Sequence, residues 1–272
     1  MSPRVSDTTP GGKIPSGSLS LHSLEVAQRR MALPDVSLEL VWIDGRVDVI
    51  GPMSKGRPTR YAIGDRLTVL SIDPIWAAAW IGMPLRSLTD QVVDLADIDP
   101  TLAGVVLEHF ANGDVRRFLS VEPSAGSHGP LSRAATAADM LSRGRRVGRV
   151  AEHLNLCERQ LTRSFEALTG LHPKRFSRIA RLRRAVMLAK EGAGLAAAAA
   201  AAGYADQAHL ARDMRALTGQ SPRQILPHVG NVQDIAAWKP EKRDAASDSQ
   251  VAGSGTGDIS WGRSSGGGQG FD

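Results

Sequence analysis

The stretch that decides the fold runs from Arg181 to Gln220 and reads RLRRAVMLAKEGAGLAAAAAAAGYADQAHLARDMRALTGQ. Its centre is a run of seven alanines at 196–202, and alanine has the highest helix propensity of all residues. Gly203 follows and is suited to end a helix, because glycine enters the left-handed region without steric cost. Asp206 can then cap a second helix with its carboxylate. The stretch therefore predicts a helix, a tight turn and a second helix.

The second of these helices has one apolar face. Leu210, Met214 and Leu217 recur at i, i+4 and i+7, a spacing that places them on the same side of a helix. Two helices joined by a short glycine-containing turn form a helix-turn-helix motif, whose second helix enters the DNA major groove. An ordinary helical hairpin in a protein core would show the same pattern, so this stretch alone leaves both interpretations open.

A second copy of the same unit lies upstream. Residues 147–168 again predict a short helix, a turn at Asn155 and a second amphipathic helix. The sequence LTGLHP at 168–173 matches LTGQSP at 217–222, 49 residues later. Repetition of one supersecondary unit indicates tandem modules. Residues 173–190 lie between the copies and predict a connecting helix with basic residues on its outer face.

Residues 131–230 resemble the DNA-binding domain of the AraC/XylS family of transcriptional regulators, which has two helix-turn-helix units joined by a long helix. The resemblance implies a sequence-specific regulator of transcription that binds double-stranded DNA and, as an activator, contacts RNA polymerase. The residues that carry it are the basic helix from Arg181, Gly203-Tyr204, Asp206-Gln207, Leu210, Arg212, Thr218-Gly219 and Ser221-Pro222.

The distribution of charge agrees with a nucleic-acid partner for one half of the chain. Residues 131–226 contain seventeen Lys/Arg and seven Asp/Glu, a balance of +10, so the remainder carries −5 of the net +5. A basic half beside an acidic half indicates a polyanionic partner for the basic half. A basic surface that serves only solubility would give the same count.

Other features of composition exclude several classes of protein. No run of about 18 apolar residues is present, so we expect no membrane span. The N-terminus has no apolar secretory core, and the single cysteine, Cys157, cannot form an internal disulfide or a cysteine-rich zinc site. These features predict a cytoplasmic protein. His22 and His109 are far apart in the N-terminal half, so we expect no metal site and no cofactor.

The N-terminal half predicts a small β-rich domain. Asp44-Gly45 is a hairpin signal between two apolar segments. With Pro34-Asp35, Gly51-Pro52 and the run IGMPLRSLTD at 81–90, this region resembles the N-terminal regions of one AraC-like subgroup. The resemblance implies a cupin-like or barrel-like domain that senses a small-molecule effector, forms a homodimer, or both. Strands are expected at 36–43, 46–50, 60–63 and 66–72, and helices at 74–80 and 101–111.

The predicted fold class is therefore α+β: a β-rich, cupin-like N-terminal domain followed by an all-α domain with two helix-turn-helix motifs. We expect a disordered tail at 1–20, the sensor or dimerisation domain at 21–120, a linker at 121–130, the DNA-binding domain at 131–230 and a flexible tail at 231–272. Polar and small residues dominate both tails and the linker.

The residues expected to contact DNA lie on the two second helices and the connecting helix. The first two turns of a recognition helix face the base edges. Arginines spaced three residues apart on the connecting helix can follow a phosphate backbone, although a solvated helix face would look the same. The expected base-facing residues are Arg159, Thr162, Arg163, Gln207, His209 and Arg212, and the expected phosphate-facing residues are Arg175, Arg178 and Arg181.

Two departures from the family pattern fall inside the motifs. Cys157 replaces the usual serine cap, and a thiol caps a helix poorly. Ala198 and Ala202 replace larger aliphatic residues, a loss that costs about 2–5 kcal/mol where the site cannot collapse. We therefore expect the second motif to be less well packed and to contribute less to binding than the first.

Two alternatives to a ligand-responsive regulator remain. The N-terminal domain could be catalytic, as in alkyl-transfer repair proteins, but Cys157 would be its only reactive cysteine and lies at a predicted cap. The domain could also serve dimerisation alone. We expect no enzymatic activity.

Overall fold

The N-terminal half contains a five-stranded antiparallel sheet in the order β2-β7-β4-β5-β8. This computed structural model describes residues 14–15, 18–27, 31–121 and 130–226. Two short pairings, β1-β9 and β3-β6, accompany the sheet. The strands are β1 (Ile14–Pro15), β2 (Leu19–Glu25), β3 (Met31–Ala32), β4 (Leu38–Ile43), β5 (Arg46–Ile50), β6 (Arg57–Pro58), β7 (Arg66–Ile72), β8 (Val92–Asp94) and β9 (Ser120–Val121).

The hairpin between β4 and β5 has the predicted turn. Asp44 and Gly45 both have positive φ, 47° and 75°, as a two-residue type I′ turn requires. The strand predicted at 60–63 is wrong. There Asp65 accepts a hydrogen bond from the backbone of Ala62 (2.7 Å) and Gly64 has φ 97°, so the segment forms a turn before β7.

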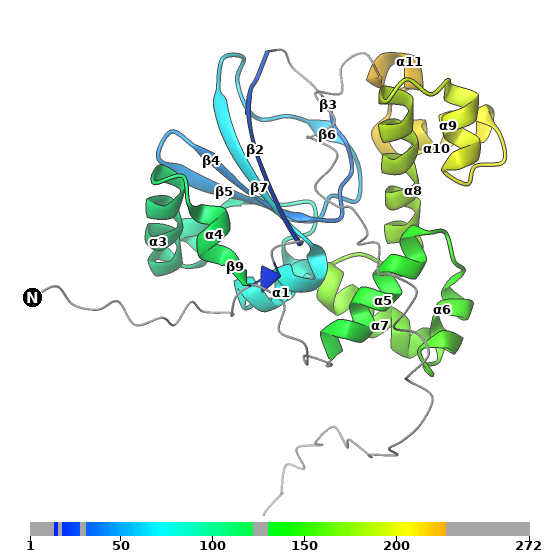
Figure 1. Ribbon diagram of the computed structural model, residues 1–272, viewed down its shortest axis with the longest axis horizontal. Helices are drawn as coiled ribbons and strands as arrows, with labels where there is room; N and C mark the ends of the chain where they lie inside the picture. The colour runs from blue at the N-terminus through cyan, green and yellow to red at the C-terminus, as the bar shows by residue number, and fades with distance from the viewer. Residues whose placement is uncertain (1–13, 16–17, 28–30, 122–129, 227–272) are drawn as a thin grey trace, which may run out of the picture. The chain divides into compact units, whose positions relative to one another are not determined.

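Both faces of the sheet are covered, because strand residues alternate between two cores. On one face Leu38, Leu40 and Leu70 pack with Phe110 and other helical residues, and Figure 1 shows α3 and α4 on this side. On the opposite face Val41 and its neighbours form a smaller core with Met53. The helices of this half are α1 (Pro74–Ile81), the 3-10 helix η2 (Leu85–Ser87), α2 (Leu95–Ile98), α3 (Pro100–Ala111) and α4 (Val115–Leu119).

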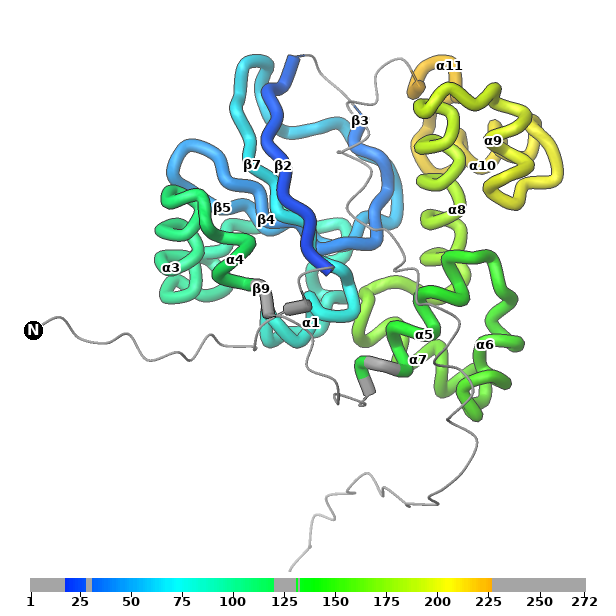
Figure 2. Tube along the Cα trace, in the orientation of Figure 1, coloured from blue at the N-terminus to red at the C-terminus, as the bar shows by residue number. Residues whose placement is uncertain are grey.

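The C-terminal half of the described chain is helical, with two helix-turn-helix units at the ends of α8 (Figure 2). Phe165 and Phe176 meet edge to face at 5.0 Å between ring centroids and tie the first unit to α8. The helices are α5 (Pro130–Ser142), α6 (Val147–His153), α7 (Glu158–Thr169), α8 (Pro173–Lys190), α9 (Leu195–Ala201), α10 (Gln207–Thr218) and α11 (Pro222–Ile225).

The predicted α+β class, with a β-rich region followed by tandem helix-turn-helix units, is confirmed. The domain boundaries stay predictions. Most of the predicted linker and both predicted tails lie outside the described residues, although Leu19 and Ser20 already belong to β2 because they pair with β7. In the described part of the chain, no helix has the length and apolarity that a bilayer crossing requires.

Candidate nucleic-acid interface

The two helix-turn-helix units correspond residue by residue, except in their turns. α6 and α9 begin 48 residues apart, whereas α7 and α10 begin 49 apart. The second turn is therefore one residue longer than the first. Asn155 has φ 54° in the first turn and Gly203 has φ 85° in the second, so both predicted left-handed positions are confirmed. Each turn delivers its second helix with one face buried and the other in solvent.

On α7, the inner and outer faces separate as the spacing predicts. Leu161 and Phe165 are buried, whereas Arg159 and Arg163 are exposed and Thr162 is half-buried. Gln160 Oε1 accepts a hydrogen bond from the Cys157 N–H at 3.0 Å, which supplies the reciprocal half of a capping box. The glutamine thus supports a helix start at which the thiol is only a weak acceptor.

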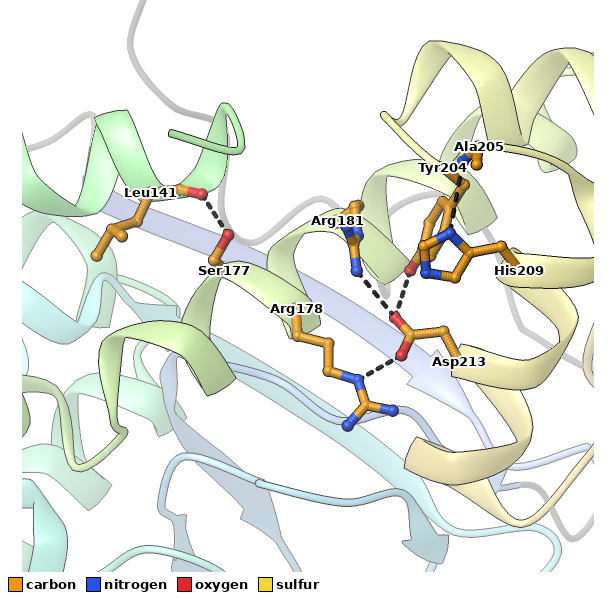
Figure 3. Close-up of polar contacts among 8 residues, drawn as sticks. All are labelled: Leu141, Ser177, Arg178, Arg181, Tyr204, Ala205, His209 and Asp213. Atoms are coloured by element: carbon orange, nitrogen blue, oxygen red, sulfur yellow. Dashed lines mark hydrogen bonds and ion pairs between the residues drawn. The ribbon is translucent and has the colours of Figure 1, made fainter. Parts of the chain in front are cut away.

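On α10, the predicted residues occupy different environments. Gln207 and Arg212 are exposed, and His209 is half-buried. The imidazole of His209 turns back towards the turn, where its Nδ1 lies 3.5 Å from the Ala205 nitrogen and its ring meets Tyr204 edge to face at 5.1 Å (Figure 3). Asp206 accepts from the His209 N–H at 2.6 Å and confirms the predicted cap.

Asp213 forms ion pairs with two of the three arginines that were predicted to face phosphates. Its carboxylate contacts Arg178 Nε and Arg181 Nη2, the latter at 3.5 Å, and accepts from the Tyr204 hydroxyl at 2.9 Å (Figure 3). Asp213 is only 6% exposed. The Arg181 guanidinium also lies 4.4 Å from the Tyr204 ring centroid, a cation–π distance. Burial, and then the negative charge of Asp213, raise the pKa of Tyr204.

This cluster ties α10 and the turn before it to α8. Sequence reasoning missed Asp213, although an acidic residue immediately before the buried Met214 was a signal that it lies at the edge of the inner face. Arg175, the third predicted residue, is half-buried one turn nearer the start of α8. Ser177 Oγ donates to the Leu141 carbonyl at 2.8 Å and ties the same helix to α5.

The two units differ most in cationic side chains. At matching positions the first unit has Arg145, Arg146 and Arg149, all exposed, and the second has Ala193, Gly194 and Ala197. Arg159 and Thr162 likewise correspond to Ala208 and Ala211, and only the pair Arg163 and Arg212 is shared. Sequence reasoning did not single out the arginines before and within α6, although alignment of the two copies shows that the second lacks them.

The alanine tract forms part of the buried core. Ala198 and Ala199 are 0% exposed and Ala202 is 7% exposed, and the last two belong to the core cluster that contains Tyr204 and Leu210. The expected looser packing at Ala198 and Ala202 stays a prediction.

A separate cavity of about 440 Å³ adjoins the smaller core of the N-terminal sheet. Its wall is mainly apolar and includes Val41, Met53 and Tyr61, with Arg183 contributed by α8. The Tyr61 hydroxyl donates to buried Asp48 at 3.1 Å, and burial, followed by Asp48, raises the pKa of Tyr61. Trp80 belongs to the core on the opposite face of the sheet. Among the described residues, no group of three His, Cys, Asp or Glu side chains could hold a metal ion.

Comparisons with known proteins agree with the geometry of the helical half. A family model described as a helix-turn-helix domain matches residues 150–227. A search of curated proteins found no match to the chain.

Among solved structures, the chain is similar to ToxT from Vibrio cholerae. An apo variant from strain SCE256 is 11% identical over 78% of this chain and 97% of that one, with a TM-score of 0.45. ToxT from strain O395 is 10% identical over 79% and 99%, with a TM-score of 0.44. Wild-type ToxT with a bound unsaturated fatty acid is 12% identical over 78% and 95%, with a TM-score of 0.43.

Proposed function

We propose that the protein is a sequence-specific regulator of transcription of the AraC type, which binds double-stranded DNA through both motifs; the helix-turn-helix family model that matches residues 150–227 supports the proposal. The observation that carries the proposal is the pair of recognition helices, α7 and α10, each buried on one face and exposed on the other. They belong to a domain whose charge balance favours a polyanion.

The exposed side chains on α7 have the chemistry of base readout. Arg159 and Arg163 can each donate two hydrogen bonds to guanine O6 and N7, and Thr162 can place its methyl group against thymine. On α10, Gln207 suits adenine N6 and N7, and Arg212 suits guanine or a phosphate. His209 completes the proposed set once its ring leaves Tyr204. We propose these six residues as the source of sequence preference.

Phosphate contacts provide the other part of the proposed interface. Arg175, Arg178 and Arg181 project from α8, the helix between the motifs. Asp213 already compensates the charge of Arg178 and Arg181. We therefore expect Arg175 to contribute more than either to the salt dependence of binding, since that dependence reports the phosphates neutralised.

Selection of bound duplexes from a random DNA pool tests the proposal directly. We expect an enriched sequence and an affinity for it that falls steeply with salt. Arg163→Ala should relax the base preference at one half of the enriched site, whereas Arg215→Ala, an exposed control elsewhere on α10, should leave that preference unchanged. A purified protein that enriches no sequence at any salt concentration would refute the assignment.

We further propose that the N-terminal cavity binds a small, largely apolar effector. Its volume lies within the usual range for small-molecule sites of roughly 300–1,000 Å³, and an apolar wall with a few polar groups is typical of such sites. Arg183 and Tyr61 are candidates to orient the effector. A thermal-shift screen of amphipathic metabolites tests this: hits should lose their effect in Val41→Trp, which fills the cavity. Dimerisation and contact with RNA polymerase stay predictions.

A further inference from the structure

Two loops of the N-terminal half contact the C-terminal ends of both recognition helices. The Gly56 N–H donates to the Leu217 carbonyl of α10 at 2.8 Å. Thr89 Oγ1 donates to the carbonyl of Gly170, the residue that ends α7, at 3.0 Å, and also lies 3.2 Å from the Leu85 carbonyl. These contacts fall within one compact unit of the chain.

The contacted sites are nearly equivalent in the two units. Gly170 corresponds to Gly219, and Leu217 lies two residues before Gly219 in the same helix end. Both contacts are close. A Cβ added at Gly170 would lie 2.5 Å from Thr89 Oγ1, and one added at Gly56 would lie 3.3 Å from the Thr218 backbone. Both loops therefore approach their helices closely at glycine positions that leave no space for a side chain.

The same two loops are joined to each other through Asp90. Its carboxylate accepts from the Ser54 N–H and from the Ser54 hydroxyl, both at 2.7 Å, and its own N–H donates to the Pro52 carbonyl at 2.9 Å. Asp90 has φ 61°, a conformation that costs a non-glycine residue energy unless its surroundings hold it there. The carboxylate bonds to Ser54 provide that support.

A third contact holds α8 between the two units. Arg183 is 7% exposed and forms an ion pair with buried Asp35 at 2.5 Å. Asp35 also accepts from the Met53 N–H through its backbone carbonyl at 2.8 Å. Met53 directly precedes Ser54, so the contact with α8 is linked to the loop that contacts α10 and, through the bonds of Ser54 to Asp90, to the loop that contacts α7.

We propose that residues 52–58 and 88–91 form a brace that fixes the separation and relative orientation of the two recognition helices. Without the brace, the units are joined by α8 alone, and a single helix can bend and twist. With it, α8, the two units and the N-terminal loops form a closed ring. The brace thereby sets the spacing between the two DNA segments that the protein can bind at once. This inference rests on the proposed DNA-binding function.

The brace also forms part of the cavity wall. Met53, Arg57, Asp90 and Gln91 line the cavity. Any molecule that fills the cavity therefore contacts the brace directly, and through it the ends of both recognition helices.

The test measures the distance between the two helices in full-length protein. Cys157, the chain's single cysteine, is exposed at the start of α7, and Ala208→Cys supplies a second label site on α10, where Ala208 is exposed. Pulsed electron resonance on the doubly labelled protein should give one narrow distance. Asp90→Gly removes both side-chain bonds to Ser54 but tolerates the positive φ, and it should broaden the distribution. An unchanged width would overturn the proposal.

Asp44→Gly is the matched control, because Asp44 is also an aspartate with positive φ, 47°, but lies in the exposed turn between β4 and β5. It should leave the distance unchanged. If Asp90→Gly fails to fold, Thr89→Val takes its place, since it removes one hydroxyl at nearly constant volume. Its distribution must also broaden, or the brace is refuted.

A DNA readout separates this inference from the proposed function. Inserting about 5 bp between the two halves of the selected site moves one half to the opposite face of the duplex. We expect that insertion to cost the wild-type protein about tenfold in affinity through lost simultaneous contact, and the Asp90→Gly variant less than about threefold. Equal losses would contradict the brace. If the wild-type protein selects no duplex, the proposed function fails, while the label distances still decide whether the brace exists.

Discussion

The first helix-turn-helix unit has exposed arginines at positions where the second has alanine and glycine. The second unit, however, is attached to α8 by a buried carboxylate. Asp213 on α10 contacts Arg178 and Arg181. The equivalent residue on α7 is the exposed Ser164, whose hydroxyl bonds only within its own helix, to the Gln160 carbonyl at 2.9 Å. The two copies of one fold therefore differ in role under the proposed function: the first carries most of the exposed cations, and the second attaches itself to α8 through Asp213, which pairs with arginines of that helix.

The largest effect that this comparison predicts is on stability. Asp213→Ala should lower the free energy of unfolding by about 2–3 kcal/mol, because it leaves two partly buried arginines and the Tyr204 hydroxyl without their acceptor. Ser164→Ala, at the matching position of the first unit, should change it by less than about 0.5 kcal/mol. Urea denaturation followed by circular dichroism measures both. Equal losses would mean that the second unit does not depend on the charge cluster.

The next effect is on DNA affinity at the one cationic position that both units share. Arg163→Ala should weaken binding to the selected duplex by about tenfold or more, since an arginine paired with guanine contributes about 1–3 kcal/mol. Arg212→Ala should cost less than about fivefold, because its neighbours in the second unit lack the supporting arginines. Fluorescence anisotropy at fixed salt gives both affinities, and a larger loss for Arg212→Ala would reverse the assignment of roles.

A smaller effect concerns the arginines that precede α6. Arg146→Gln should reduce the slope of log affinity against log salt by about 0.9 if it neutralises one phosphate. Gly194, the matching residue, is already without charge, so Gly194→Arg should raise the slope by a similar amount. Anisotropy titrations across a range of salt concentrations measure both slopes. A flat response to both substitutions would exclude this face of the units from the interface.

The smallest effect is in the turns. Gly203→Ala forces a side chain into the left-handed region and should destabilise the protein by about 1 kcal/mol. Asn155 adopts the matching conformation in the first turn, and asparagine tolerates it. Asn155→Gly should therefore change the free energy of unfolding by less than about 0.5 kcal/mol. Thermal melts of the two variants make the comparison, and a neutral Gly203→Ala would show that the second turn can adopt another backbone path.

Local sequence was sufficient wherever one residue type decides one conformation. Asp44-Gly45, Gly203 and Asp206 could each be assigned from the chain alone, because a positive φ or a free helix end admits few side chains. The strand predicted at 60–63 was wrong for a similar local reason. The Asp65 carboxylate accepts a hydrogen bond from the Ala62 N–H, which competes with pairing of this segment to a neighbouring strand.

The contacts of Arg178, Arg181 and Arg183 could not be read from the sequence. All three lie on one helix and belong to one residue type, yet Asp213 and Asp35 reach them from segments 35 residues ahead and nearly 150 residues behind. Their partners depend on how α10 and the N-terminal loops pack against α8, which no local pattern encodes.

The tandem arrangement on α8 makes any recognised DNA directional. Two identical recognition helices related by a two-fold axis would match a palindromic site, whose sequence is the same from either end. Here two different recognition helices, α7 and α10, follow one another in a fixed order along one chain. The proposed DNA target is therefore asymmetric. Under the proposed function, one bound molecule consequently points one way along the DNA, and inverting its target relative to a neighbouring gene would turn the molecule around.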